Sequence, residues 1–80
     1  MNEFDYLAKA KNKMDDEKYN EVISLCDKAL KINDDLSDAY NIRGNANCYL
    51  KNYEDAIDDL SKAITINPNN ADYYYDKSWV

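Results

Sequence analysis

The sequence has no histidine, one arginine, one glycine and one proline among its 80 residues. Without histidine, neither a Ser–His–Asp triad nor a Cys–His pair can form within this chain, so we expect no enzyme. A multi-turn β architecture needs glycine or proline at its corners, and their scarcity favours helices. The single glycine, Gly44, lies inside a predicted helix, so the sequence has no glycine-rich loop to hold a phosphate.

Positive charge is also scarce. Ten basic residues are scattered among sixteen acidic ones, which gives a net charge of −6. Binding to nucleic-acid phosphates or to an anionic membrane requires clustered Lys and Arg, so we expect neither partner. No segment approaches the ~20 apolar residues of a membrane span. The N-terminal residues show no basic stretch followed by an apolar run, so we expect no secretory signal and a cytoplasmic protein.

The two cysteines and the acidic runs give no sign of a reactive or metal-binding site. In a reducing cytoplasm, Cys26 and Cys48 are expected to be small apolar fillers of a core. The acidic stretch 33–38 lacks the central glycine and the distal glutamate of a calcium-binding loop, and we interpret it as a solvated connection. Asp58 and Asp59 are interpreted as part of an exposed helix face. We therefore predict no metal and no cofactor.

A repeat of 34 residues organises the chain. Shifting the sequence by 34 residues places Tyr6 on Tyr40, Tyr19 on Tyr53, Ile23 on Ile57, Lys28 on Lys62 and Ala29 on Ala63. The same shift places Tyr40 on Tyr74 and Arg43 on Lys77. Such self-similarity at one period is typical of stacked helical repeats. We predict one domain over 1–80, with repeat 1 at about 3–36, repeat 2 at about 37–70 and part of a third repeat at about 71–80.

Helical spacing of apolar residues fills each unit. One stripe consists of Tyr19, Val22, Ile23, Cys26, Ala29 and Leu30, and its copy consists of Tyr53, Ala56, Ile57, Leu60, Ala63 and Ile64. A weaker helix precedes each stripe, at about 3–15 and 37–50, and carries a small residue (Ala10 or Gly44) where a neighbouring helix can approach closely. Ser37 and Asn52 are expected to cap helices through their side-chain oxygens. The connections are short, so consecutive helices should be antiparallel neighbours.

This helix–turn–helix unit resembles the tetratricopeptide repeat family. Repeat 2 carries most of the resemblance, with Tyr40, Gly44, Ala56, Leu60, Ala63 and Pro68 at the family's preferred positions. Membership would imply an all-α fold, a right-handed superhelical stack of antiparallel helix pairs with five helices in this chain. It would also imply a concave groove, lined by the first helix of each repeat, that binds a peptide or a partner helix. An interaction module or scaffold is the function we expect.

The resemblance places eleven residues at the groove: Leu7, Lys11, Met14, Asn41, Ile42, Asn45, Tyr49, Asp72, Tyr75, Asp76 and Trp79. Aromatic anchors flanked by polar groups suit a protein-binding surface. The alternative is that these are packing residues, or that a further helix covers them in a longer parent protein. Some family members bind the C-terminal carboxylates of heat-shock chaperones through lysines, asparagines and an arginine. Asp72 and Asp76 stand at two of those places, so a basic or apolar ligand is expected instead.

The third unit contains only its first helix within this sequence. A bare apolar side there would indicate a piece of a longer array or an oligomer formed through the C-terminal helix. A structural or self-associating segment with no peptide ligand therefore remains the alternative to an interaction module.

Overall fold

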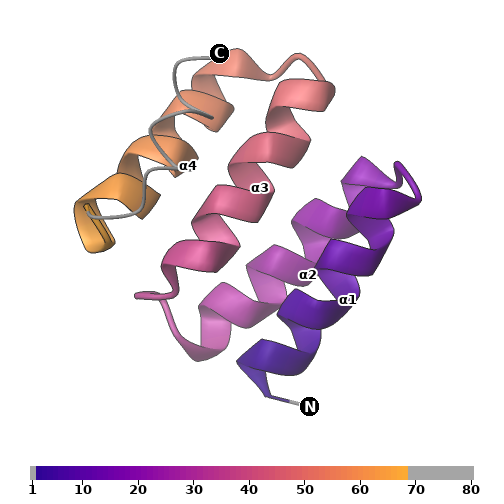
Figure 1. Ribbon diagram of the computed structural model, residues 1–80, viewed down its shortest axis with the longest axis horizontal. Coiled ribbons are helices and arrows are strands. Elements are labelled where there is room, and N and C mark those ends of the chain that lie inside the picture. Colours follow the sequence, from indigo (N-terminus) through magenta and orange to yellow (C-terminus); the bar gives the residue numbers. More distant parts are fainter. Residues whose placement is uncertain (1, 69–80) are drawn as a thin grey trace.

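Four helices and their connecting turns make up the described part of the chain (Figure 1). The computed structural model describes residues 2–68. The helices are α1 (Glu3–Asp15), α2 (Tyr19–Ile32), α3 (Ser37–Tyr49) and α4 (Tyr53–Ile66). The predicted all-α class is confirmed, and α1 and α3 end within one residue of their predicted bounds. The predicted helix at about 71–80 lies outside the described residues.

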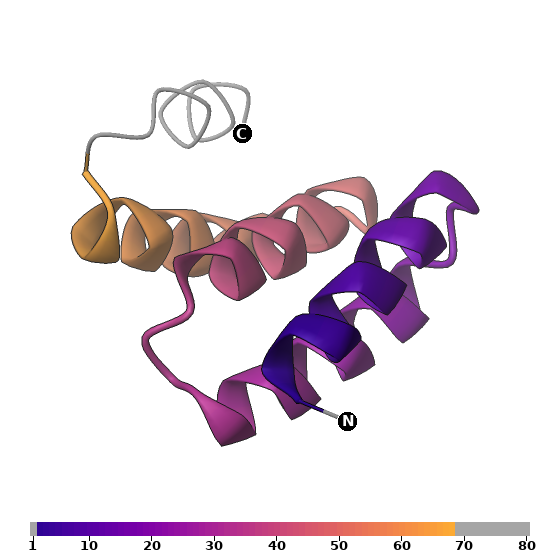
Figure 2. The same ribbon diagram turned by 60° about the horizontal axis from the view of Figure 1, so that its bottom comes forward.

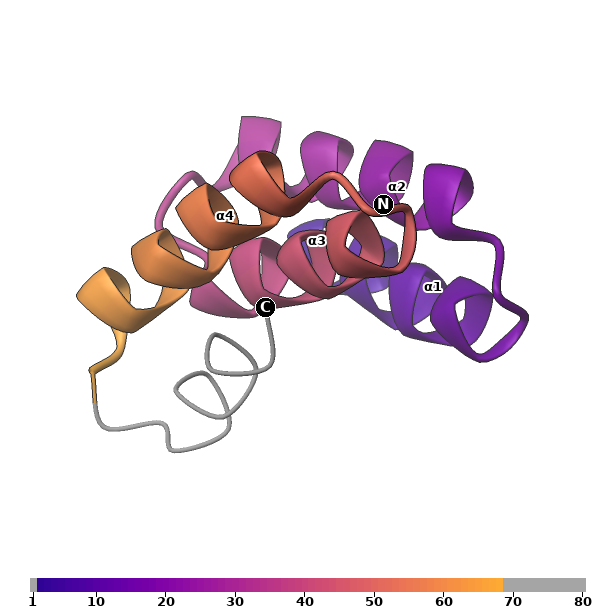
Figure 3. The same cartoon turned by 90° about the horizontal axis from the view of Figure 1, so that it is seen from above.

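The helices pack as two antiparallel pairs in sequence order. Helix α1 packs on α2 and α3 packs on α4, while α2 also packs on α3 and thereby joins the pairs. Figure 2 shows the two pairs as separate units inclined to each other. Figure 3 shows α2 and α4 along one side of the stack and α1 and α3 along the other. This arrangement follows from the short connections, which leave each helix beside its neighbours in sequence.

The core consists of buried residues from all four helices, with part of each apolar stripe of α2 and α4 and with Leu7, Tyr40 and Ile42 on α1 and α3. Val22, Cys26 and Leu60 are the largest side chains that are fully buried. Burying an aliphatic side chain of this size stabilises the fold by about 1.5–3 kcal/mol. Most other fully buried positions are alanines, which lets the helix axes approach closely.

Gly44 lies where α3 closely approaches α4. A Cβ atom placed on Gly44 would lie 2.9 Å from Leu60 Cγ and 3.2 Å from Asp59 Cβ. Both distances are shorter than ordinary van der Waals contact, so a larger residue would push the helices apart. The predicted role of this small residue is confirmed.

The two repeats contain the same contact between a lysine and a tyrosine, made by residues that lie 34 positions apart. The Lys28 ammonium lies 6.0 Å from the centre of the Tyr6 ring, and the Lys62 ammonium lies 5.4 Å from the centre of the Tyr40 ring. A cation above an aromatic face is attracted by the ring's electron density. These contacts explain why tyrosine and lysine recur together at this step.

The turn within each repeat contains a left-handed residue. Glu17 has φ 60° and Lys51 has φ 65°, and they lie 34 residues apart. In each turn the next amide donates to a carbonyl five residues earlier: Lys18 N to Lys13 O at 3.0 Å, and Asn52 N to Asn47 O at 2.8 Å. This is the Schellman pattern, which usually places glycine at the left-handed position.

The helix caps differ from the predicted ones. Asn2 caps α1, with its side-chain oxygen accepting from Asp5 N at 2.9 Å and the Asp5 carboxylate accepting from Asn2 N at 3.1 Å. Asn52 precedes α4 but makes no capping hydrogen bond, and Ser37 is the first residue of α3 instead of its cap. The backbone of Asn52 (φ −87°, ψ 69°) is not in the extended conformation that is typical of a capping residue.

Candidate interaction surfaces

Two of the predicted groove residues lie in the core. Leu7 is 5% exposed and Ile42 is 8% exposed, and both pack in the cluster that joins α1, α2 and α3. Each offers only a small edge to a ligand. Their side chains hold the first helices against α2, and their contribution to peptide binding stays a prediction.

Four further predicted residues lie nearer the surface of α1 and α3. Lys11 is exposed, Met14 packs partly against the core, and Asn41 and Asn45 are half-buried. The Asn41 side-chain oxygen is buried and has no hydrogen-bond partner among the described residues. These side chains offer one charge and two amides, which suits a polar flank of a binding surface.

Tyr49 is the exposed aromatic residue among the predicted groove residues that the structure describes. Its side chain is 53% exposed, and its ring stacks on Tyr19 with centroids 4.7 Å apart and planes inclined by 5°. Desolvation raises the pKa of Tyr19, and the negative charge of Glu17 and of an ionised Tyr49 adds to the rise. The stack fixes the end of α3 on the start of α2. The other predicted residues, Asp72, Tyr75, Asp76 and Trp79, lie outside the described residues.

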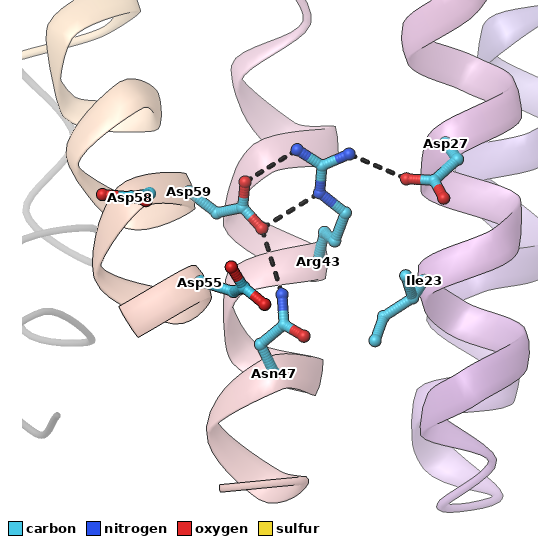
Figure 4. A pocket seen from close by; sticks show the side chains of 7 residues that line it. All are labelled: Ile23, Asp27, Arg43, Asn47, Asp55, Asp58 and Asp59. Carbon is cyan, nitrogen blue, oxygen red and sulfur yellow. Dashed lines mark hydrogen bonds and ion pairs between the residues drawn. The ribbon is translucent and has the colours of Figure 1, made fainter. Parts of the chain in front are cut away.

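A second surface, which the sequence did not predict, is a cleft between α2 and α4 with α3 as its floor (Figure 4). Arg43 on α3 spans this cleft. Its Nε and Nη2 donate to the Asp59 carboxylate at 3.0 Å and 2.7 Å, and its Nη1 donates to Asp27 Oδ1 at 2.7 Å. Asn47 Nδ2 donates to Asp59 Oδ2 at 3.2 Å. One guanidinium thus links three helices and both repeats.

The two ion pairs of Arg43 differ in burial. The Asp59 side chain is 10% exposed and that of Asp27 is 50% exposed. The hydrogen bonds to Asp59 raise the pKa of Arg43 above its ordinary value most, and the hydrogen bond to Asp27 adds to the rise. Partial desolvation lowers this pKa, but by less than the hydrogen bonds raise it. The bidentate pair with Asp59 is the stronger one, because little water competes for it.

The cleft is acidic. It encloses about 420 Å³ and is lined by Ile23, Asp27, Arg43, Asn47, Asp55, Asp58 and Asp59. Four carboxylates and one guanidinium therefore line the cleft. Within the described residues, Asp55 and Asp58 form no ion pair, so the cleft carries excess negative charge.

Asp59 corrects one prediction. We expected Asp58 and Asp59 to form an exposed face, but Asp59 is 7% exposed and buried against α3. Asp59 precedes Leu60 and stands in step with Leu25 of repeat 1, at the edge of the apolar stripe. A carboxylate at such a position indicates a buried partner, and Arg43 is the single arginine available.

The cysteines fit their predicted role as fillers. Cys26 and Cys48 are buried free thiols, and burial raises the pKa of Cys26 to about 12. Reactive thiols have a lowered pKa, so Cys26 is inert at neutral pH. Over residues 2–68, no group of three or more acidic or cysteine side chains is gathered as a metal site. None of the helices α1 to α4 is long and apolar enough to cross a membrane.

The helix pair α3–α4 has a recognisable family pattern. The family model described as "Tetratricopeptide repeat" matches residues 37–70, which include α3, α4 and the turn between them. The chain carries a tetratricopeptide repeat. The preceding pair, α1–α2, has the same packing and the same turn, so the four helices are consistent with two tetratricopeptide repeats. No curated protein matches the chain significantly.

The match to the tetratricopeptide repeat family indicates a general class of function. Proteins of this family are generally protein–protein interaction modules, and the repeat itself is generally not catalytic. The fold alone does not identify a ligand, because function depends on the residues at each surface.

Proposed function

We propose that this protein binds a peptide or a partner helix on the face formed by α1 and α3. The observation that supports this proposal is the Tyr19–Tyr49 stack, in which the Tyr49 ring packs on Tyr19 while Tyr49 stays 53% exposed at the end of α3. A rigid aromatic side chain gives a large contact area at a low entropic cost, as binding hot spots require. Lys11, Asn41 and Asn45 supply polar groups on the same two helices.

The proposed ligand is basic or apolar. The chain has a net charge of −6, so a basic peptide is attracted at long range and an acidic one is repelled. An apolar side chain of the ligand would pack on the Tyr49 ring. The groove residues at 72–79 stay a prediction, and they would add two further acids and two aromatic rings to this surface.

A random-peptide phage library tests this proposal on the full chain. The selected peptides should be enriched in Lys, Arg and apolar residues. Their affinity should fall about 10-fold or more in Tyr49→Ser, because loss of an aromatic hot spot typically costs that much or more. Ile32→Ser is the matched control, because Ile32 has a similar exposure of 51% at the end of α2 and should leave this binding unchanged. Selection of acidic peptides, or an equal loss in both variants, would contradict the proposal.

The alternative is a structural segment that self-associates. The exposed apolar side chains on α4, Tyr53 and Ile57, favour it over a protein with no further contacts. Light scattering over a concentration series distinguishes the two functions. A monomer at all concentrations that still selects peptides supports the interaction module, and a reversible oligomer that selects none supports the alternative.

A further inference from the structure

Tyr49 is the last residue of α3 and the more exposed member of the Tyr19–Tyr49 pair. It is 53% exposed, and the left-handed residue Lys51 follows it in the turn to α4. An exposed tyrosine populates more than one staggered rotamer unless a contact selects one of them. A ligand that needs one rotamer must otherwise order the ring itself, which lowers its affinity.

Tyr19 is the member of the pair that the core holds. It is the first residue of α2 and packs, partly buried, against the cluster that joins α1, α2 and α3. The two ring centroids lie 4.7 Å apart and the ring planes are inclined by 5°, which is a stacked arrangement. Because the core holds one ring, the contact selects the Tyr49 rotamer that lies parallel to it.

Tyr19 belongs to a helix outside the proposed binding face. Figure 3 shows α2 on the side of the molecule opposite to α1 and α3. An effect of Tyr19 on ligand binding would therefore be transmitted by the Tyr49 ring. A stacked aromatic pair, or a side chain that is ordered before binding, corresponds to about a 2- to 10-fold difference in affinity.

We propose that Tyr19 is a positioning residue for the face formed by α1 and α3. It orders the Tyr49 ring before a ligand arrives, and it raises affinity without contacting the ligand. This inference rests on the proposed function, because it assigns the source of part of the affinity of that face. It adds a residue of α2 to a surface that α1 and α3 otherwise form.

Two substitutions at position 19 test this role on the full chain, with one peptide selected as described above. Tyr19→Leu keeps an apolar side chain against the core but removes the ring, so affinity should fall about 3- to 10-fold. Tyr19→Phe keeps the ring and should bind within about 2-fold of the original protein. Circular dichroism checks that each variant folds, and Tyr19→Met takes the place of Tyr19→Leu if the leucine variant does not fold.

Tyr6→Leu is the matched control for a disturbed core. Tyr6 also packs, partly buried, against the cluster that holds Tyr19, but it makes no stack with Tyr49. Peptide affinity should stay unchanged in Tyr6→Leu. A loss equal to that in Tyr19→Leu would assign the effect to general loosening of the core and overturn the positioning role.

A double variant shows whether Tyr19 acts through Tyr49. The ring is already absent in Tyr49→Ser, so adding Tyr19→Leu should weaken binding by less than about 2-fold more. NMR of the full chain with labelled tyrosine rings provides a measurement without ligand. The Tyr49 ring signals should show the ring-current shift of a stacked ring, and this shift should disappear in Tyr19→Leu and persist in Tyr19→Phe.

The outcomes separate this inference from the proposed function. Failure to select peptides, or full affinity in Tyr49→Ser, would overturn both. Full affinity in Tyr19→Leu alongside a loss in Tyr49→Ser would overturn only the positioning role. Equal losses in Tyr19→Leu and Tyr19→Phe would overturn it too, because the hydroxyl group would then be responsible. A further loss from Tyr19→Leu in the double variant would do the same, because it would indicate direct contact with the ligand.

Discussion

Replacing Arg43 with methionine should destabilise the fold by about 3 kcal/mol. The substitution leaves the Asp59 carboxylate buried, with a side chain only 10% exposed and the Asn47 amide as its remaining donor. Removing one partner of a buried ion pair costs about 3–5 kcal/mol, and the residual exposure and the Asn47 bond place this case at the lower end. A domain of this size has a free energy of unfolding of roughly 4–12 kcal/mol, so the loss is a large share.

Urea denaturation of the full chain, followed by circular dichroism at 222 nm, measures this loss. In a separate thermal unfolding experiment, the Tm should fall by roughly 12–24 °C, since about 1 kcal/mol corresponds to roughly 4–8 °C in a domain of this size. Asp27→Asn is the matched control. The Asp27 side chain is 50% exposed, so its ion pair with Arg43 should contribute less than about 1 kcal/mol.

A double variant tests the reason for the loss. Arg43→Met combined with Asp59→Leu removes both charges and places at position 59 the residue found in step at Leu25. Its stability should return to within about 1 kcal/mol of the original protein, because two packed apolar side chains often replace a buried pair without cost. Equal small losses in Arg43→Met and Asp27→Asn would refute the distinction between the buried and exposed pairs. A double variant as unstable as Arg43→Met would refute the unpaired charge as the cause.

Three further predictions concern packing, the turns and the buried thiol. Gly44→Ala should destabilise the fold by about 1–2 kcal/mol in urea denaturation, because the clash with Leu60 outweighs the gain in helix propensity. A variant more stable than the original protein would contradict the close approach of α3 and α4. Lys51→Gly should stabilise the fold by about 1 kcal/mol, measured as a higher Tm, and unchanged stability would argue against strain at its positive φ. The folded pKa of Cys26 is raised from 9.0 to about 12, so the unfolded thiol ionises first and stability should fall as pH rises from about 9 toward 12. Cys26→Ala should flatten that part of the pH–stability curve, and identical curves would contradict the assignment.

The repeat determined most of what the sequence could predict. The 34-residue step and the apolar stripes of α2 and α4 are local patterns, and they fixed the helix bounds and the antiparallel pairing. The same step identified Gly44 as the close contact, because a small residue within a helix has a packing consequence that can be inferred from sequence. The match of residues 37–70 to a family model depends on the same residues.

The tertiary structure decided which members of each pattern are covered. Leu7 and Ile42, two of the predicted groove residues, are nearly buried because α1, α2 and α3 converge on them, and their contribution to peptide binding stays a prediction. Asp59 was predicted to be exposed, and it is buried because Arg43 reaches it from another helix. Such outcomes depend on contacts between residues distant in sequence, which helical periodicity does not encode.

Tyr19 and Tyr53 show the same division most clearly. The sequence by itself made Tyr19 and Tyr53 equivalent, since both begin an apolar stripe with the same spacing. Only the tertiary structure made them different, because Tyr49 of α3 stacks on Tyr19 while the described residues place no ring on Tyr53. A residue's type and period determine that it can be buried, and the position of the neighbouring helix determines whether it is.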